Sequence, residues 1–422
     1  MRLISNDKVI NIMEQTLNHV DTRLVNHGRR VAYLMFKVLY GNSKFTHEEL
    51  HNVCLLGLLH DVGAYKTEEI DRMVEFETED TWGHSIYGYL FLKYFSPLKT
   101  LASVLLFHHA DCHEARFLID PTQRFLANLI SLCDRADIFI LHKGSSDEFV
   151  EYITKGRGTK YDSDVVDAYI ESGVNLDIVF NDLMQDKLFM NVLYSVDLSD
   201  EDALAYLRMI VSFMDFRSHY TVLHTVSTTC IAVLLARMLG LDENVIIDVK
   251  TGAMLHDIGK VGVPVSILES KSQLAPHEFD IIKKHVGKTA DIIIGSVKSE
   301  ISDIAVKHHE KLNGSGYPDN RQAYNIPVTS RIVAVADIFS ALREERSYKT
   351  PYPKDKICSI LRKMADEKHI DSDIVDLAIA NYDLILDEIA KEVRPVLEVY
   401  DTIKADLARL HSAVANGMNP LD

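Results

Sequence analysis

Apolar residues recur at intervals of three and four positions along most of the chain. Residues 220–240 (YTVLHTVSTTCIAVLLARMLG) and 277–297 (HEFDIIKKHVGKTADIIIGSV) are two clear cases. This spacing places the apolar side chains on one face of an α-helix, and no run of alternating strand segments appears. Short turns, such as 239–245 and 312–320, separate the periodic segments. The pattern predicts an all-α fold.

Histidines and aspartates interrupt this pattern in the same order twice. In each half, a histidine is followed by a His-Asp pair, a single histidine, two adjacent histidines and an aspartate. The intervals are 33, 24, 24 and 25 residues in the first half and 32, 29, 23 and 28 in the second. The first set is His27, His60, Asp61, His84, His108, His109 and Asp134, and the second set is His224, His256, Asp257, His285, His308, His309 and Asp337. Such an ordered repeat indicates two tandem helical bundles of one type.

The repeat also predicts two domains. A chain of 422 residues is long enough for more than one hydrophobic core. We expect residues 1–195 to form the first domain and residues 196–422 the second. The stretch 143–200 carries no matching histidines, so we expect it to complete the first bundle and lead into the second.

Composition excludes several classes of function. The net charge of −17 argues against binding to a nucleic-acid polymer, which needs clustered lysine and arginine. The five cysteines form no CxxC pair, so neither a disulfide framework nor a zinc knuckle is indicated. No apolar run approaches the ~20 residues of a membrane span, and the first 15 residues lack the apolar core of a signal peptide. We therefore expect a cytoplasmic protein with no membrane partner.

The repeated residue types favour transition metals. Imidazole and carboxylate together suit Fe, Mn, Zn, Co or Ni better than Ca or Mg. Two metals ~3.5–4 Å apart need a shared group, which a carboxylate supplies, and Asp257 beside His256 suits that role. Such a pair polarises a phosphoryl oxygen and generates a bridging hydroxide that attacks phosphorus in line with the leaving oxygen. Lys260, one helical turn after Asp257, would stabilise the developing negative charge.

Three stretches of the second half carry a family resemblance. LHDIGK (255–260), KHHEKLNGSGYP (307–318) and RIVAVADIFSALREERSYK (331–349) resemble the HD-GYP family, a branch of the HD superfamily of metal-dependent phosphohydrolases. The resemblance covers roughly residues 215–366. It implies a helical bundle with two or three metal ions, often iron or manganese, and hydrolysis of cyclic dinucleotides, chiefly cyclic di-GMP, in bacterial signalling.

Matched position by position, the resemblance assigns roles to residues of this chain. The second set of seven would hold the metals, and Asp257 would also take part in catalysis. Lys260 would be the catalytic lysine. The substrate-binding residues that it implies are Gly316, Tyr317, Pro318, Arg346 and Lys349.

Three positions depart from the family pattern. Asn313 and Ser340 stand where the family usually has aspartate. Neither position is a metal ligand in the pattern, so we expect the pocket to differ while the metal site stays intact. Tyr220 stands where members with three metals carry glutamate. We therefore expect two divalent ions, iron or manganese, with nickel, cobalt, zinc or magnesium as alternatives.

The first half resembles a plain HD domain. It keeps the whole first set of ligand-type residues, which forms a candidate second metal site. Ala64 stands where the second half has Lys260, and no GYP loop follows His109. These differences argue against the same cyclic-dinucleotide reaction, so we expect a regulatory or dimerising role for this domain.

The sequence narrows the range of possible substrates but does not decide between two cyclic dinucleotides. The two-domain layout resembles HD-GYP members that open 3′,3′-cyclic GMP-AMP, so cyclic di-GMP and cyclic GMP-AMP both stay open. The alternatives are an HD phosphohydrolase acting on nucleotides or (p)ppGpp, and a sensor that binds a cyclic dinucleotide without cleaving it. A homodimer or a signalling protein is the expected macromolecular partner.

Overall fold

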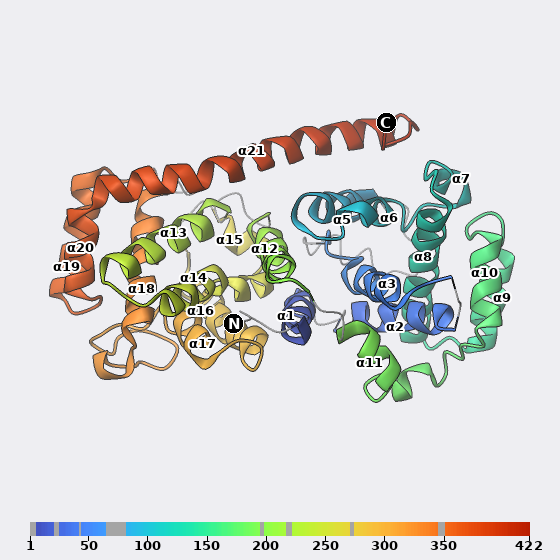
Figure 1. Cartoon of the computed structure of the whole chain (residues 1–422), viewed down its shortest axis with the longest axis horizontal. Helices are drawn as coiled ribbons and strands as arrows, with labels where there is room; N and C mark the ends of the chain where they lie inside the picture. The colour runs from blue at the N-terminus through green and yellow to red at the C-terminus, as the bar shows by residue number, and fades with distance from the viewer. Residues whose placement is uncertain are drawn as a thin grey trace. The chain divides into compact units, whose positions relative to one another are not determined.

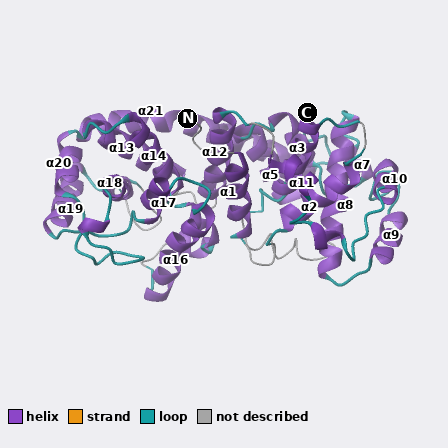
Figure 2. Cartoon of the chain, turned by 60° about the horizontal axis from the view of Figure 1, so that its bottom comes forward, coloured by secondary structure: helices purple, strands orange, loops and turns teal. Residues whose placement is uncertain are grey.

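The chain is built of helices and the turns between them. The structure, a computed structural model, describes residues 6–20, 25–41, 44–64, 82–194, 198–216, 222–270, 274–344 and 351–422. Within these ranges no strand occurs, and the only strand-like pairings are isolated bridges (Figure 2). The predicted all-α fold is confirmed. None of the helices in the described ranges is both long enough and apolar enough to cross a lipid bilayer.

The chain divides into two compact units, which Figure 1 shows with their helices labelled. The first unit comprises residues 1–209 and 402–422, and the second comprises residues 210–401. The division after residue 209 lies beyond the predicted boundary near residue 195. The last residues of the chain also group with the first unit, whereas the sequence pattern assigned them to the second domain.

The elements of the two units follow in chain order. Those of the first unit are α1 (Asn6–Asn18), α2 (His27–Leu39), α3 (His47–Leu59), α5 (Trp82–Phe95), η2 (Lys99–Leu101), α6 (Ala102–Leu106), α7 (Cys112–Ala115), α8 (Pro121–Leu141), α9 (Ser146–Lys155), α10 (Ser163–Glu171), η3 (Val179–Asp182) and α11 (Lys187–Tyr194). The first division falls within α12 (Asp200–Phe216). Those that follow are α13 (Val222–Met238), α14 (Glu243–Leu255), η4 (Ile258–Gly262), α15 (Val265–Leu268), α16 (Pro276–Ile293), α17 (Ser299–Val306), η5 (Ala323–Asn325), α18 (Val328–Arg343), α19 (Lys354–Asp366), α20 (Ser372–Ala380) and α21 (Tyr382–Ala415). The second division falls within α21.

The same packing arrangement appears in each unit. In the first unit α2 packs against α3 and α8, and α5 packs against α6. In the second unit α13 packs against α14 and α18, and α16 packs against α17. These helices, or the residues that directly follow them, carry the repeated histidines and aspartates. The two tandem bundles that the repeat predicts are therefore present.

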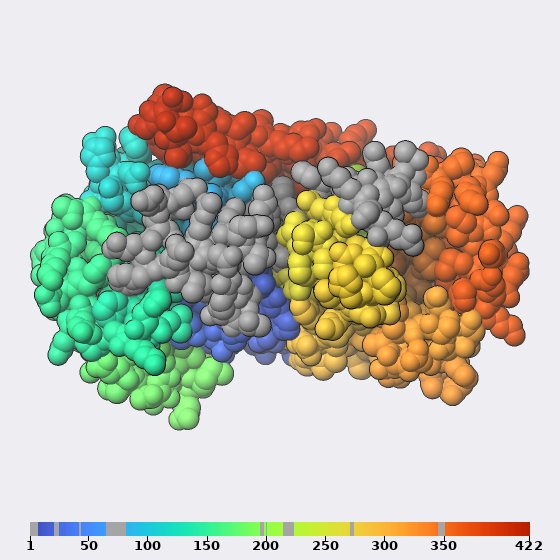
Figure 3. Space-filling view, turned by 180° about the vertical axis from the view of Figure 1, so that it is seen from behind, coloured from blue at the N-terminus to red at the C-terminus, as the bar shows by residue number. Residues whose placement is uncertain are grey.

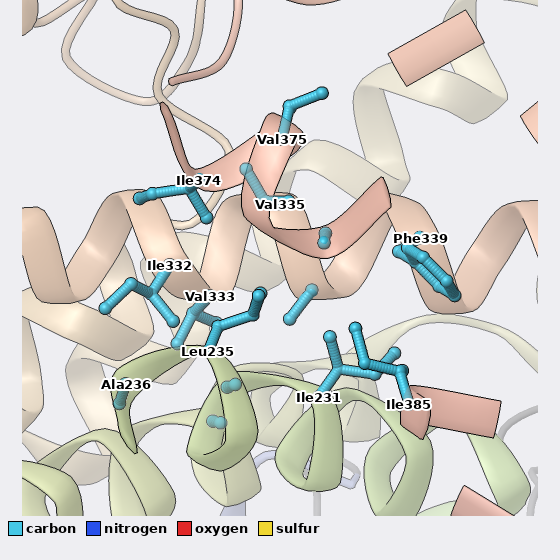
Figure 4. Packing of buried hydrophobic residues seen from close by; sticks show 14 of the residues in the cluster. Ile231, Leu235, Ala236, Ile332, Val333, Val335, Phe339, Ile374, Val375 and Ile385 are labelled. Atoms are coloured by element: carbon cyan, nitrogen blue, oxygen red, sulfur yellow. The ribbon is translucent and has the colours of Figure 1, made fainter. Parts of the chain in front are cut away.

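A buried hydrophobic cluster fixes the spacing of α13, α18 and α20 in the second unit (Figure 4). Its members have almost no solvent exposure, as expected of a close-packed core. They include Ile231, Leu235, Ile332, Val333, Phe339, Ile374 and Val375. Since His224 lies on α13 and Asp337 on α18, this packing sets the distance between the two side chains.

Capping residues define where ligand-bearing helices begin in the first unit. Thr46 and Glu49 form a capping box at the start of α3, each side chain pairing with the other residue's backbone amide. The Asp120 carboxylate accepts two backbone N–H groups at the start of α8, where Pro121 is the first helical residue. Such caps stabilise a helix end by about 1 kcal/mol each.

A glycine two residues after each His-Asp pair permits a close helix approach. A Cβ added to Gly259 would collide with the carbonyl oxygen of His285 and the amide of Thr289 on α16. In the first unit, a Cβ added to Gly63 would collide in the same way with the carbonyl oxygen of His84 on α5. The glycine thus lets the turn after the His-Asp pair lie directly against the helix that supplies the next histidine.

We predict that Gly259→Ala destabilises the second unit by about 1–3 kcal/mol, because the methyl group forces the turn away from α16. Gly287→Ala is the matched control, since it lies on the exposed side of α16 with no atom near the added Cβ. That control should be neutral or gain up to about 1 kcal/mol of helix stability. Thermal unfolding of the metal-free full chain measures both. A Gly259→Ala protein as stable as the parent would contradict this packing argument.

Candidate metal centre

The structure brings all seven residues of the second set into one cluster, here called the second-unit cluster. The residues form two groups, whose donor atoms lie within 4.8 Å of one another in each group. The first group is His224, His256 and Asp257, and the second is His285, His308 and His309. Asp337 adjoins both, with Oδ1 3.0 Å from Nε2 of His224 and Oδ2 3.8 Å from Nδ1 of His309.

Asp257 lies between the two groups of histidines. Its Oδ2 is 3.2 Å from Nε2 of His256, and its Oδ1 is 3.3 Å from Nε2 of His285. Each carboxylate oxygen therefore faces a different group, which is the arrangement that a carboxylate needs to bridge two metal ions. The ammonium of Lys260 approaches Oδ2 to 2.5 Å.

Three imidazoles of this cluster are oriented by the backbone. Nδ1 of His256, His285 and His308 lies 2.6 Å from the carbonyl oxygen three residues earlier, at Ala253, Ile282 and Ala305 respectively. With Nδ1–H donating to a carbonyl, Nε2 carries the free lone pair and points to the centre of the cluster.

Several buried atoms of the cluster have no hydrogen-bond partner among the described residues. They are Nε2 of His256, His285 and His308, together with Oδ1 of Asp257. Buried polar atoms are rarely left unpaired, because desolvation without a partner costs about 1–3 kcal/mol each. Orphaned imidazole nitrogens around a shared carboxylate fit a pair of divalent metal ions, which would supply the missing partners.

Burial and neighbouring charges set the protonation of the cluster. Burial lowers the pKa of His285 to about 4 and the pKa of His309 to about 3, so both rings are neutral near pH 7. Burial alone would raise the pKa of Asp257, but His256 and Lys260 outweigh it and hold that pKa well below its usual range. Neutral imidazole and ionised carboxylate are the forms that bind metal.

His224 differs from the other imidazoles. Burial alone would lower its pKa, but the carboxylates of Glu344 and Asp337 outweigh that effect and raise the pKa to about 10. The ring therefore carries a second proton in the metal-free protein, and a metal ion at Nε2 would take the place of one proton.

The first unit gathers the first set of residues in the same way, in a cluster here called the first-unit cluster. Its two groups are His27, His60 and Asp134, and Asp61, His84, His108 and His109. Oδ2 of Asp61 lies 3.3 Å from Nε2 of His27 and 3.2 Å from Nε2 of His60, while Oδ1 lies 3.8 Å from Nε2 of His84. Both oxygens of Asp61 are buried without a hydrogen bond to any described residue, as is Nε2 of His60, His84 and His108. This cluster therefore fits metal ions on the same grounds.

The first-unit cluster differs at its accessible side. Ala64 leaves open the position that Lys260 fills in the second unit, and a pocket lined in part by Ala64, Asp61, His27 and Arg29 lies there. The His109 side chain is only 9% exposed, compared with 26% for His309. The first-unit cluster thus differs in which ligands are accessible, and it has no lysine three residues after its central carboxylate.

The loop after His309 packs over the second-unit cluster. The ring of Tyr317 lies 4.7 Å from the ring of His309, and the Tyr317 amide donates to the His309 carbonyl. Glu310 is buried, and its carboxylate accepts the backbone N–H groups of Asp319 and Arg321 at 2.7 and 2.8 Å. Gly316 has no room for a Cβ against Glu310, and Pro318 follows Tyr317 in the same turn. These contacts hold the Gly-Tyr-Pro segment in a fixed position beside the cluster.

η4 and α15, which follow the His-Asp pair of the second unit, belong to the yellow segment on the surface in Figure 3. The Lys260 side chain on η4 is 20% exposed, so its ammonium can reach a ligand that approaches from solvent. Arg346 and Lys349, the two predicted phosphate contacts, lie outside the described residues, as does Tyr220.

Three functional contacts were missed by sequence reasoning. Glu310 anchors the loop, and Asp137 and Glu344 each lie against Nδ1 of the first histidine of their cluster. Asp137 follows Asp134 by three positions on one helix face, so helical periodicity was a usable signal for it. Glu310 directly follows the His-His pair. Glu344 carried no signal, because its contact depends on where α18 ends.

Comparison with known proteins agrees with this picture. The family model described as HD domain matches residues 209–374. A 3′3′-cGAMP-specific phosphodiesterase of Vibrio cholerae is 27% identical over 390 residues, which cover 87% of this chain and 89% of that protein. A cyclic di-GMP phosphodiesterase of Thermotoga maritima is 35% identical over 158 residues, which cover 37% of this chain and 42% of that protein.

The fold is also shared with a solved structure. The crystal structure of a cyclic GMP-AMP-specific phosphodiesterase of V. cholerae (V-cGAP3) matches with a TM-score of 0.57 and 19% sequence identity, covering 90% of this chain and 98% of that chain. At that identity the likeness establishes the fold. The resemblance to HD-type phosphodiesterases that the motifs indicate is confirmed, and residues 209–374 are the part of this chain that matches the HD domain model.

Proposed function

We propose that the second unit is a metal-dependent phosphodiesterase that hydrolyses a cyclic dinucleotide to a linear dinucleotide. The observation that carries this proposal is the position of Asp257, which faces two groups of histidines while Lys260 contacts it from the open side. The relative that matches 87% of the chain is named as cGAMP-specific. This similarity favours 3′,3′-cyclic GMP-AMP as the preferred substrate, with cyclic di-GMP as the close alternative.

The ligand groups would hold two divalent ions, for which iron or manganese suits the mixed imidazole and carboxylate donors. One ion would lie at His224, His256 and Asp337, the other at His285, His308 and His309, with Asp257 shared. Metal ions bound there polarise a phosphoryl oxygen and lower the pKa of a water molecule. Lys260 donates from its ammonium to the negative charge that develops on the phosphoryl group.

The loop beside the cluster would position the substrate. Tyr317 is half-buried beside His309 and offers part of its ring to a stacked base. Gly316 lets the loop backbone approach closely, and Pro318 restricts the same turn. We assign Arg346 and Lys349 to the substrate phosphates on the basis of the family pattern. The loop and Lys260 favour a cyclic dinucleotide over a mononucleotide or (p)ppGpp, because both belong to the pattern of the cyclic-dinucleotide phosphodiesterases that this chain resembles.

We predict that the double substitution His256→Ala with Asp257→Ala lowers kcat/KM by at least about 10²–10³-fold, because it removes the shared carboxylate and one imidazole. Chromatographic product analysis against a panel of cyclic GMP-AMP, cyclic di-GMP, (p)ppGpp and mononucleotides measures the loss. His60→Ala with Asp61→Ala is the matched control in the first unit and should retain turnover. Cyclic-dinucleotide cleavage that survives the first pair of changes would rule out the second-unit cluster as the reaction site.

We predict that Lys260→Ala, which reproduces Ala64 of the first unit, lowers kcat by about 10²-fold and leaves the metal content unchanged. The reason is that Lys260 donates to charge on the substrate and is not needed to hold a metal. Steady-state kinetics and elemental analysis on the same preparation separate the two effects. Native kcat in Lys260→Ala would show that the lysine has no part in the reaction.

A second role is favoured by the orphaned atoms of the first-unit cluster. We propose that this unit binds two metal ions without hydrolysing cyclic dinucleotides, because its ligand geometry is complete while the lysine and the loop are absent. A metal site without the lysine and the loop suits a regulatory or dimerising domain.

For this second role we predict four metal ions per chain after reconstitution with manganese, and two after His60→Ala with Asp61→Ala. Inductively coupled plasma mass spectrometry on the desalted full chain gives the count, with His256→Ala and Asp257→Ala as the reciprocal control. If the parent chain and the His60→Ala, Asp61→Ala variant both contain two ions per chain, the first-unit histidines hold no metal.

A further inference from the structure

The imidazole of His224 is held at both nitrogens by carboxylates, one on α18 and one on the residue that directly follows this helix. Nε2 lies 3.0 Å from Oδ1 of Asp337, and Nδ1 lies 3.0 Å from Oε2 of Glu344. Between them, the hydroxyl of Ser340 donates to Oε1 of Glu344 at 2.5 Å. Asp337 and Ser340 stand at i and i+3 on one face of α18, and Glu344 is the residue at which the helix ends. Ser340 is fully buried and Glu344 nearly so.

His224 has a side-chain partner at Nδ1, whereas three other imidazoles of the second-unit cluster have backbone partners there. His256, His285 and His308 each follow at least one complete helical turn, and the carbonyl oxygen three residues earlier accepts the Nδ1–H of each ring. His224 lies in the first described turn of α13, and its Nδ1 faces the carboxylate of Glu344, the residue that directly follows α18.

The first unit meets the same need with different residues. His27 is the first residue of α2, and its Nδ1 lies 2.7 Å from Oδ2 of Asp137, three residues after Asp134. Arg30 donates to both oxygens of Asp137. The second unit has serine at both matching positions, Ser227 and Ser340. Its orienting carboxylate stands four positions after Ser340, at Glu344, directly after the end of α18.

We propose that Glu344, held by the Ser340 hydroxyl, is the positioning residue for His224. Accepting Nδ1–H fixes the tautomer that leaves Nε2 free for metal, and the negative charge increases the basicity of the ring. Ser340 limits the rotation of the Glu344 side chain and keeps Oε2 directed at the ring. The inference rests on the proposed metal-dependent hydrolysis at this same cluster.

Ser340 and Glu344 together do in the second unit what Asp137 does in the first unit. In the first unit, the residue three positions after Asp134 is Asp137, which carries the orienting carboxylate. In the second unit, the residue three positions after Asp337 is Ser340, whose hydroxyl supports the carboxylate of Glu344. The double substitution Ser340→Asp with Glu344→Ser would move the carboxylate back to the position that Asp137 occupies. It should therefore restore what Glu344→Ala loses.

The test uses the full chain with His60→Ala and Asp61→Ala in every variant, so that the second-unit cluster is the manganese site under study. Glu344→Ala should weaken manganese affinity by about 10–100-fold in calorimetric titration and lower kcat with KM unchanged. Glu344→Gln keeps the shape and should fall between the parent and Glu344→Ala. Glu243→Ala removes an exposed carboxylate at the start of α14 and should match the parent.

Ser340→Asp with Glu344→Ser should recover both metal affinity and kcat. Native affinity and kcat in Glu344→Ala and Glu344→Gln would overturn the proposal. So would an exchanged double variant that melts like the parent but stays as impaired as Glu344→Ala. A parent that hydrolyses no cyclic dinucleotide would contradict the proposed function, while the manganese affinities would still decide the role of Glu344.

Discussion

The carboxylate of Asp257 lies between two groups of histidines and faces both. It can do so because Asp257 lies in the turn that follows α14. The helix stops at Leu255, so His256 and Asp257 lie in the turn between α14 and η4. Gly259 lets that turn lie against α16, which brings His285 to the far side of the carboxylate. Each oxygen of Asp257 then faces a different group of imidazoles. Without this contact the cluster would separate into unconnected ligands.

The same constraint is met in the first unit with the same elements. Asp61 follows α3, Gly63 lies against α5, and both oxygens of Asp61 face histidines. What separates the units is the residues around the ligands. The second unit adds Lys260 and a loop anchored by Glu310, and it orients His224 through Glu344. A similar arrangement of ligands thus lies in two different surroundings, and only that of the second unit has the lysine and the loop.

The repeat made the cluster predictable from the sequence. The histidines and aspartates recur at near-equal intervals, and helices of similar length bring equivalent positions together in each bundle. The residues that orient the ligands were less accessible to such reasoning. Glu344 reaches His224 from i+7 only because α18 continues to Arg343 and packs against α13. The assignment of the last residues to the first unit was equally hidden, since α21 has continuous helical spacing through Asp401 and Thr402, where the division falls.

If Asp257 joins two metal ions in the second unit, the ions lie ~3.5–4 Å apart across a shared carboxylate and are magnetically coupled. Electron paramagnetic resonance of the manganese-loaded His60→Ala, Asp61→Ala chain measures this coupling. We expect the spectrum of an exchange-coupled manganese pair at two equivalents. A spectrum of isolated manganese ions at two tightly bound equivalents would show that Asp257 does not join a pair of ions.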